Sequence, residues 1–264
     1  MLNSEVSKIK HLMNWLIFLI VPTGICFLLF FFNDRKTVEV TKETEGTSVE
    51  LLAEQKEEKE AGATIIDVPL ENQNEGNPPL ENGCEITALS MLLNYYGYET
   101  NKNKLAEQLN YVPLYEDESQ DIHGNPHDGF VGNIYGGYDA MGVAVEPIAA
   151  VAEDYVEGNH SVVSSSSTDF SELAAIVQAG TPVWVVTTVD FQVPTANDFQ
   201  TWQTTSGEVT VSPLCHAVVV TGVDSQHVYV NDPYGYKNRI VDRSEFEEIF
   251  QAMGNESLYI ETND

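Results

Sequence analysis

Basic residues are scarce in this sequence of 264 residues. Lysine and arginine together number 12, against 41 aspartates and glutamates, which gives a formal net charge of −29. Such an excess of negative charge opposes binding to polyanions, both nucleic acids and anionic bilayer surfaces. We therefore expect no nucleic-acid partner. The acidity alone names no substrate, because surface carboxylates also keep a protein soluble whatever its activity.

Cysteine is also scarce. The chain has three cysteines, Cys26, Cys84 and Cys215, too few for the disulfide framework of a small secreted domain. Cys26 lies inside an apolar run, and we interpret it as a small buried hydrophobe. A functional role is the better explanation for at least one of the other two.

One stretch near the N-terminus lacks charge altogether. Residues 15–32 read WLIFLIVPTGICFLLFFF, close to the roughly 20 apolar residues that cross a bilayer as a helix. No small-x-small cleavage site follows, which favours an uncleaved anchor over the alternative of a removable signal peptide. We expect residues 1–36 to form a cytoplasmic stub and a single-pass membrane anchor, with the rest of the chain extracytoplasmic at the cell membrane.

The next stretch lacks aromatic residues and has few large apolar ones. Residues 37–63 are rich in Glu, Lys and Thr, so they cannot bury enough surface to offset the entropy of ordering. We expect an acidic flexible tether there. One folded domain should follow over 64–264, a length typical of a single globular unit.

Within the domain, helical patterns come first and strand patterns later. Apolar residues recur at three- and four-residue spacing from Cys84 to Tyr96, and Gly97 is a natural stop. The predicted helices are 84–96, 103–109, 146–156, 171–179 and 244–253, and the predicted strands are 65–68, 182–189, 216–223, 227–231, 239–241 and 258–261. This order predicts an α+β domain with two lobes.

Cys84 opens the first predicted helix. Asn82 is suited to the N-cap, and Glu85 can complete an Asn-x-x-Glu capping box. The free N–H groups and the positive end of the helix dipole favour a thiolate in the first turn, and the thiolate is the nucleophilic form. We therefore predict that position activates Cys84; the alternative is an inert cysteine that packs the helix start.

His216 opens a predicted strand, and Asn231 and Asp232 end the next one. A short hairpin between the two strands can bring either residue beside His216, giving a base and a group that orients it. His216 follows Cys84 by 216 − 84 = 132 residues, and Asp232 follows His216 by 232 − 216 = 16. Papain-type enzymes use this order of cysteine, histidine and polar orienter.

The segments NQNEGNPPLENGCEITALSMLLNYYGY, DIHGNPHDGFVGN and CHAVVVTGVDSQHVYVNDP together resemble the bacteriocin-processing (double-glycine leader) peptidase-like family of papain-fold proteins. The resemblance covers about 65–260. It implies a papain-like fold with an N-terminal helical lobe and a C-terminal antiparallel sheet. It further implies Cys84 as nucleophile, His216 as general base, Asp232 as orienter, and Gln73 completing an oxyanion hole with the Cys84 N–H.

The same resemblance implies a cysteine peptidase that hydrolyses peptide bonds through a thioester acyl-enzyme, acts on a peptide or protein substrate, and needs no cofactor and no metal. It also implies that the GFVGN segment is a wall of the substrate cleft. Two alternatives stay open: an acyltransferase or amidase acting on cell-wall peptides with the same machinery, and a catalytically silent binding module. The choice between Asn231 and Asp232 as orienter is open as well.

Four polar residues in one loop are candidates for a different chemistry. Asp121, His123, His127 and Asp128 could suggest metal ligands, but Gly124 and Pro126 forbid the regular helix that His-x-x-x-His needs to converge. We expect exposed loop histidines instead. Trp184 and Trp202 are expected to pack in the core.

Cys215 raises a separate question because it is next to His216. A disulfide between Cys215 and Cys84 would silence the nucleophile. The two-residue period of a strand instead predicts that Cys215 points to the face opposite His216.

Overall fold

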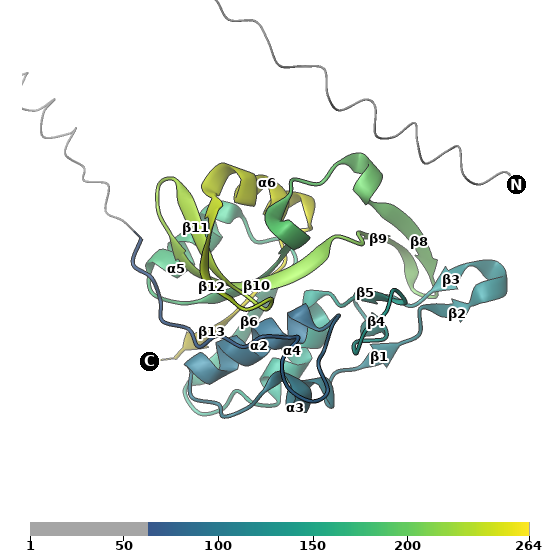
Figure 1. Cartoon of the computed structure of the whole chain (residues 1–264), viewed down its shortest axis with the longest axis horizontal. Helices are drawn as coiled ribbons and strands as arrows, with labels where there is room; N and C mark the ends of the chain where they lie inside the picture. The colour runs from purple at the N-terminus through teal and green to yellow at the C-terminus, as the bar shows by residue number, and fades with distance from the viewer. Residues whose placement is uncertain (1–62, 264) are drawn as a thin grey trace, which may run out of the picture. The chain divides into compact units, whose positions relative to one another are not determined.

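The computed structural model describes residues 63–263 (Figure 1). The predicted membrane anchor over 15–32 and nearly all of the predicted tether lie outside these residues. In the part that is described, no helix is both long enough and apolar enough to cross a membrane.

A six-stranded antiparallel sheet forms the centre of the domain. Its strand order is β12-β11-β10-β7-β13-β6. The strands are β6 (His160–Ser165), β7 (Val183–Thr188), β10 (Cys215–Val223), β11 (His227–Asp232), β12 (Tyr236–Asp242) and β13 (Ser257–Thr262). Neighbours in sequence pair as hairpins from β10 to β12, as the alternation of strand and turn residues predicts.

Helices lie on both sides of this sheet (Figure 1). They are α2 (Cys84–Tyr95), α3 (Lys102–Ala106), α4 (Val145–Glu153), α5 (Phe170–Gln178) and α6 (Arg243–Ala252). The first three form the helical lobe, and α2 packs directly against β10 and β7. The domain is α+β, which confirms the predicted fold class.

Seven short strands make two further sheets. The first has the order β1-β4-β5, from β1 (Tyr111–Val112), β4 (Phe130–Gly132) and β5 (Ala140–Gly142). The second has the order β2-β3-β8-β9, from β2 (Tyr115–Asp117), β3 (Ile122–His123), β8 (Gln200–Thr204) and β9 (Gly207–Val211). Short 3₁₀ turns occur at Glu118–Gln120, Val189–Phe191 and Ala196–Asp198.

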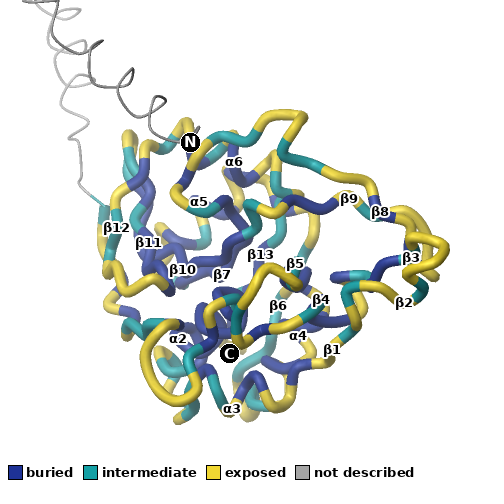
Figure 2. The backbone as a smooth tube through the Cα atoms, turned by 45° about the vertical axis from the view of Figure 1, so that its right-hand side comes forward, coloured by how far each residue is buried: buried dark blue, intermediate teal, exposed yellow. Residues whose placement is uncertain are grey.

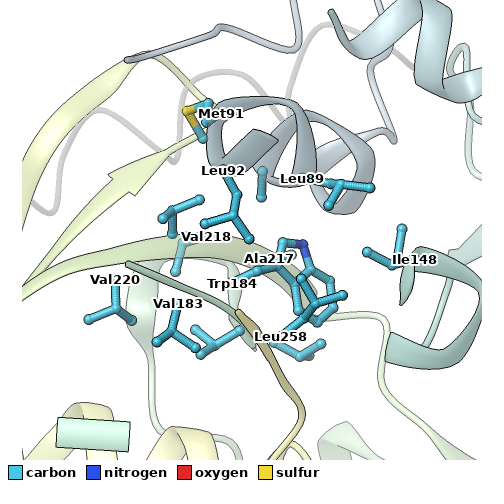
Figure 3. Packing of buried hydrophobic residues seen from close by; sticks show 14 of the residues in the cluster. Leu89, Met91, Leu92, Ile148, Val183, Trp184, Ala217, Val218, Val220 and Leu258 are labelled. Carbon is cyan, nitrogen blue, oxygen red and sulfur yellow. The ribbon is translucent and has the colours of Figure 1, made fainter. Parts of the chain in front are cut away.

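The core lies on both faces of the central sheet, against α2 and α4 on one side and α5 and α6 on the other. Figure 2 shows β7 and β10 buried along almost their whole length. Trp184 on β7 is fully buried among Leu92, Ile148 and Leu258 (Figure 3), and its Nε1 donates to the Glu85 carbonyl at 2.9 Å. The bond joins the central sheet to the first turn of α2, where Cys84 lies. Trp202 is buried in a smaller cluster, so both tryptophans pack as expected.

Some predicted elements were wrong. Residues 65–68 form no strand: Ile66 N donates to the Thr221 carbonyl, but no ladder of bonds follows. The helix predicted at 103–109 ends at Ala106. Strands β6, β8 and β9 were not predicted, because their serine, threonine and glutamine residues give a weak strand pattern.

Candidate active site

A cleft of about 260 Å³ brings together side chains from distant parts of the chain. Gln73 comes from the loop before α2, Cys84 from the first turn of α2, and His216 from the start of β10, and all three line this cleft. Asp232 lies behind His216 at the end of β11. Strands β10 and β11 pair antiparallel, with Val219 opposite Asn231, and at this end of the pair the side chains of His216 and Asp232 meet.

The imidazole of His216 is paired with the carboxyl group of Asp232. The distance from His216 Nε2 to Asp232 Oδ1 is 2.9 Å, and both side chains are almost fully buried. Because Nε2 is engaged there, Nδ1 is the ring nitrogen left for another partner. The Tyr234 ring, which also lines the cleft, stacks on the imidazole with centroids 4.8 Å apart.

Asp232 accepts several hydrogen bonds. Its Oδ1 also accepts from Tyr234 N at 2.9 Å, and its Oδ2 accepts from Arg239 Nη1 at 2.9 Å. Burial alone would raise the pKa of Asp232, but the hydrogen bonds and charges of its partners, His216 foremost, hold that pKa below its usual value. Asp232 is therefore an anion behind the imidazole. Sequence reasoning missed Arg239, whose only signal was a lone arginine on the strand next to the VNDP segment.

Asn231 faces a different environment. Its Nδ2 donates to the Val68 carbonyl at 2.9 Å, and its Oδ1 accepts from Asn238 N at 3.0 Å. The side chain is fully buried and ties two backbone segments together. Of the two residues that the sequence left open, Asp232 is the one in contact with His216.

The predicted capping box at the start of α2 is wrong. The N-cap is Gly83, with no side-chain cap. Asn82 instead donates through Nδ2 to the carbonyls of Asn133 and Gly137, at 2.9 and 3.2 Å. These acceptors lie more than 50 residues away in sequence, so a local pattern could not reveal the competition.

Glu85 turns toward the nucleophile instead of the helix cap. Its Oε2 accepts from Cys84 Sγ at 3.2 Å, and its Oε1 accepts from Val143 N at 3.2 Å. Gly142 leaves room for the carboxyl group, since a Cβ at that position would collide with Oε1. Burial raises the pKa of Glu85, which favours the neutral acid.

Burial opposes the predicted activation of Cys84 by its position at the helix start. Burial raises the pKa of the Cys84 thiol well above its usual value, and the Glu85 carboxyl and the Cys215 thiol raise it further. Within residues 63–263, the thiol makes no hydrogen bond to the His216 ring and donates to Glu85 instead. Desolvation and the carboxyl group of the next residue, Glu85, outweigh the effect of the helix start on the pKa of the thiol.

Gln73 is held firmly at the edge of the cleft. Its backbone N donates to the Pro233 carbonyl at 2.8 Å, and its side-chain Nε2 donates to the Glu81 carbonyl at 2.7 Å. A primary amide carries two N–H groups, so the second remains for a group in the cleft. The side chain is 1% exposed, and its Oε1 has no partner among the described residues.

Cys215 and Cys84 both carry free thiols, so no disulfide joins them in this structure. Cys215 lines the cleft as well, although the strand period predicts the opposite face from His216. It is the first residue of β10 and directly follows a turn in which the Cys215 N–H donates a hydrogen bond to the Ser212 carbonyl. Its register with β7 is already regular, with Cys215 opposite Thr188, and Cys215 also lines a neighbouring pocket that His216 does not reach.

The loop histidines do not converge. His123 is buried and stacks on Trp202 with centroids 4.0 Å apart, whereas His127 pairs with Glu146 at 2.8 Å. The expectation of exposure therefore fails for His123. The GFVGN segment is not a wall of the cleft either, because Phe130 and Val131 are fully buried; the wall is formed by residues 137–142.

Comparisons with known proteins show the family of this chain. A family model described as "Peptidase_C39 like family" matches residues 65–258. YvpB, an uncharacterized protein of Bacillus subtilis (strain 168), is 40% identical over 231 residues, 88% of this chain and 87% of that protein.

Two solved structures are similar. A protein from Bacillus anthracis assigned as a C39-like peptidase aligns with a TM-score of 0.70 and 33% identity, over 77% of this chain and all of that one. A double glycine motif protease from an AMS/PCAT transporter, crystallised with the leader peptide, aligns with a TM-score of 0.40 and 14% identity, over 75% of this chain and 94% of that one.

Proposed function

The chain belongs to the Peptidase_C39 like family and is a papain-like cysteine peptidase, and we propose that it hydrolyses peptide bonds with Cys84 as nucleophile, His216 as general base and Asp232 as the group that orients the imidazole. One observation carries the proposal. The buried His216–Asp232 pair opens onto the same cleft as the Cys84 thiol.

The contact with Asp232 selects the tautomer of His216. An anionic carboxylate accepts a hydrogen bond from Nε2–H, which leaves Nδ1 unprotonated and able to accept the thiol proton. The raised pKa of Cys84 means that the resting thiol is neutral. His216 therefore acts as a general base during attack, and a preformed thiolate–imidazolium pair is disfavoured.

The oxyanion is stabilised by two N–H groups. Cys84 lies in the first turn of α2, where backbone N–H groups have no helical acceptor. The second N–H of the Gln73 amide supplies the other hydrogen bond, since the Glu81 carbonyl takes the first. Donors of this kind contribute roughly 10²–10³-fold to kcat.

The reaction then follows in two steps. The sulfur of Cys84 attacks the carbonyl carbon, and the imidazolium returns its proton to the leaving amine as the C–N bond breaks. The thioester that remains is attacked by a water molecule whose proton goes to His216, and the C–S bond breaks to release the acid and the thiol. No further reactant is consumed.

The location of this activity rests on the sequence outside the described residues. Residues 15–32 carry no charge and are long enough to cross a bilayer, and an acidic stretch follows them. We therefore place the peptidase domain outside the cell membrane on a single-pass anchor. Accessibility of the domain to added protease in intact cells tests this: a domain degraded only after lysis contradicts it.

A proteome-derived peptide library tests the peptidase. We expect the full chain to produce cleavages that Cys84→Ala abolishes and that His216→Ala slows by roughly 10²–10⁴-fold. His227→Ala is the matched control, because His227 is half exposed on the neighbouring strand and pairs with Asp224, and it should cleave like the parent chain. Identical digests from the parent and Cys84→Ala would overturn the proposal and favour acyl transfer or binding.

A further inference from the structure

A second, smaller pocket adjoins the catalytic cleft. This side pocket is lined by Met141, Val143, Val186, Cys215, Met253 and Glu256, among others. It shares Met141 and Cys215 with the cleft that holds Cys84 and His216. A substrate chain in the cleft therefore passes the mouth of the side pocket.

The size of the side pocket limits what can enter. Its volume is about 70 Å³. A water molecule needs about 10–15 Å³ of such volume, so the pocket has room for roughly five non-hydrogen atoms. A single unbranched side chain of about the length of lysine or methionine fits this volume, whereas the larger aromatic side chains exceed it.

The lining of the side pocket combines apolar side chains with the hydroxyl groups of Thr210 and Ser212, the imidazole of His127 and one carboxyl group, that of Glu256. Glu256 precedes β13, and its Oε2 accepts from Val145 N at 2.7 Å at the start of α4. Its Oε1 accepts no hydrogen bond from any of the described residues and is not sealed from solvent. One oxygen is thus used in capping a helix, and the other remains for a ligand.

The charges around Glu256 do not compensate it. Burial raises the pKa of Glu256 to about 7, and the nearby carboxyls of Glu146 and Glu85 also act to raise it, while the Val145 N–H and His127 act to lower it. A largely buried carboxylate is costly unless a cation pairs with it. An ammonium group at the end of an apolar stem supplies that cation, and the stem packs against the walls.

We propose that the side pocket is a specificity subsite that takes a basic side chain of the substrate, lysine by its length, with the Glu256 carboxylate as its charge partner. The inference deepens the proposed peptidase function and rests on it. The net charge of −29 acts in the same direction, because it draws basic peptides toward the domain. Acidic side chains are excluded from the side pocket by the same charge.

The test compares lysine with norleucine, which has a similar stem but no charge. Starting from a peptide that the full chain cleaves, each residue is placed at the three positions on either side of the scissile bond, and kcat/KM is measured. At one position we expect lysine to exceed norleucine by roughly tenfold or more. In Glu256→Gln that ratio should fall to about one, with the norleucine rates unchanged.

Two features make this outcome specific. Glu256→Gln keeps an oxygen that can accept from Val145 N, so the start of α4 retains its cap. Glu146→Gln is the matched control: it removes a nearby negative charge from outside the side pocket and should keep the lysine preference. A preference for lysine that survives in Glu256→Gln, or no preference at any position, overturns the inference.

A second measurement needs no turnover, so it separates this inference from the peptidase proposal. Cys215 lines the side pocket, so its reactivity depends on the charge there. In the Cys84→Ala background, its rate of reaction is measured with two reagents, cationic 2-aminoethyl methanethiosulfonate and neutral ethyl methanethiosulfonate. We expect the cationic-to-neutral ratio to fall several-fold in Glu256→Gln and to persist in Glu146→Gln. An equal ratio in all three proteins overturns the inference even if peptides are cleaved.

Discussion

Two buried carboxyl groups, those of Asp232 and Glu85, lie beside His216 and Cys84 respectively, and they take opposite charge states. Asp232 and Glu85 are each no more than 1% exposed. The pKa of Asp232 is lowered, whereas the pKa of Glu85 is raised, and burial pushes both upward. The difference comes from their partners: Asp232 meets an imidazole and a guanidinium, while Glu85 meets a thiol and one backbone N–H.

Because both carboxyl groups are buried, the hydrogen-bond donors and cations that contact each of them determine its charge state. An anion behind His216 stabilises the imidazolium that forms during attack. A neutral acid beside Cys84 avoids placing a second negative charge next to the developing thiolate. The two sides therefore support one reaction only while Asp232 is ionised and Glu85 is protonated.

Removing the anion should have the largest effect. Asp232→Asn keeps the size of the side chain but takes away the charge and disturbs the tautomer of His216, so we expect kcat/KM to fall by roughly 10²–10⁴-fold. Steady-state kinetics on a cleaved peptide measure this. Asp224→Asn removes a carboxylate from the turn between β10 and β11, outside the cleft, and should leave the rate unchanged. Equal losses in both variants would contradict the role of Asp232.

The sequence predicted the Asp232 side of the cleft better than the Glu85 side. Strands β10 and β11 have strong apolar patterns joined by a short turn, so the proximity of His216 and Asp232 follows from local pairing. The start of α2 was also predicted, at Cys84. These features depend on residues close together in the chain.

The Glu85 side depends on contacts between distant segments. The carbonyls of Asn133 and Gly137 draw Asn82 away from the cap, and Val143 and Trp184 hold Glu85 and its backbone. No helix-capping pattern contains that information. The charge state of a buried acid likewise depends on its tertiary partners, so the sequence could not predict that Cys84 would be a neutral thiol.

Replacing Glu85 by a residue that cannot ionise tests its effect on the neighbouring thiol. At high pH the Glu85 carboxyl ionises, and its negative charge raises the pKa of Cys84. Glutamine at position 85 cannot ionise, so Glu85→Gln removes this effect. We expect the pH profile of Cys84 alkylation by iodoacetamide to move to lower pH, with a several-fold faster rate at mildly alkaline pH. Mass-spectrometric mapping assigns the label to Cys84 and not to Cys215.

Glu81→Gln is the control for this prediction. Glu81 is an exposed carboxyl at the rim of the same cleft, where solvent screens its charge. Its removal should leave the alkylation profile close to that of the parent chain. Overlapping profiles for the parent and Glu85→Gln would show that the Glu85 charge does not act on the thiol.

The smallest expected effect is on stability, and its sign differs between the two carboxyls. The folded pKa of Glu85 is raised, so its stabilising contribution is complete below its unfolded pKa and is lost as pH rises through the folded value. The folded pKa of Asp232 is lowered, so its contribution is present above its unfolded pKa and is lost as pH falls through the folded value.

Relative to the parent, Glu85→Gln should gain a few degrees in Tm toward alkaline pH. Asp232→Asn should lose a few degrees at neutral pH and approach the parent in acid, at roughly 2–4 °C per kcal/mol. Thermal unfolding followed by circular dichroism across pH measures both differences, and parallel Tm curves for all three proteins would mean that the two carboxyls do not differ in charge.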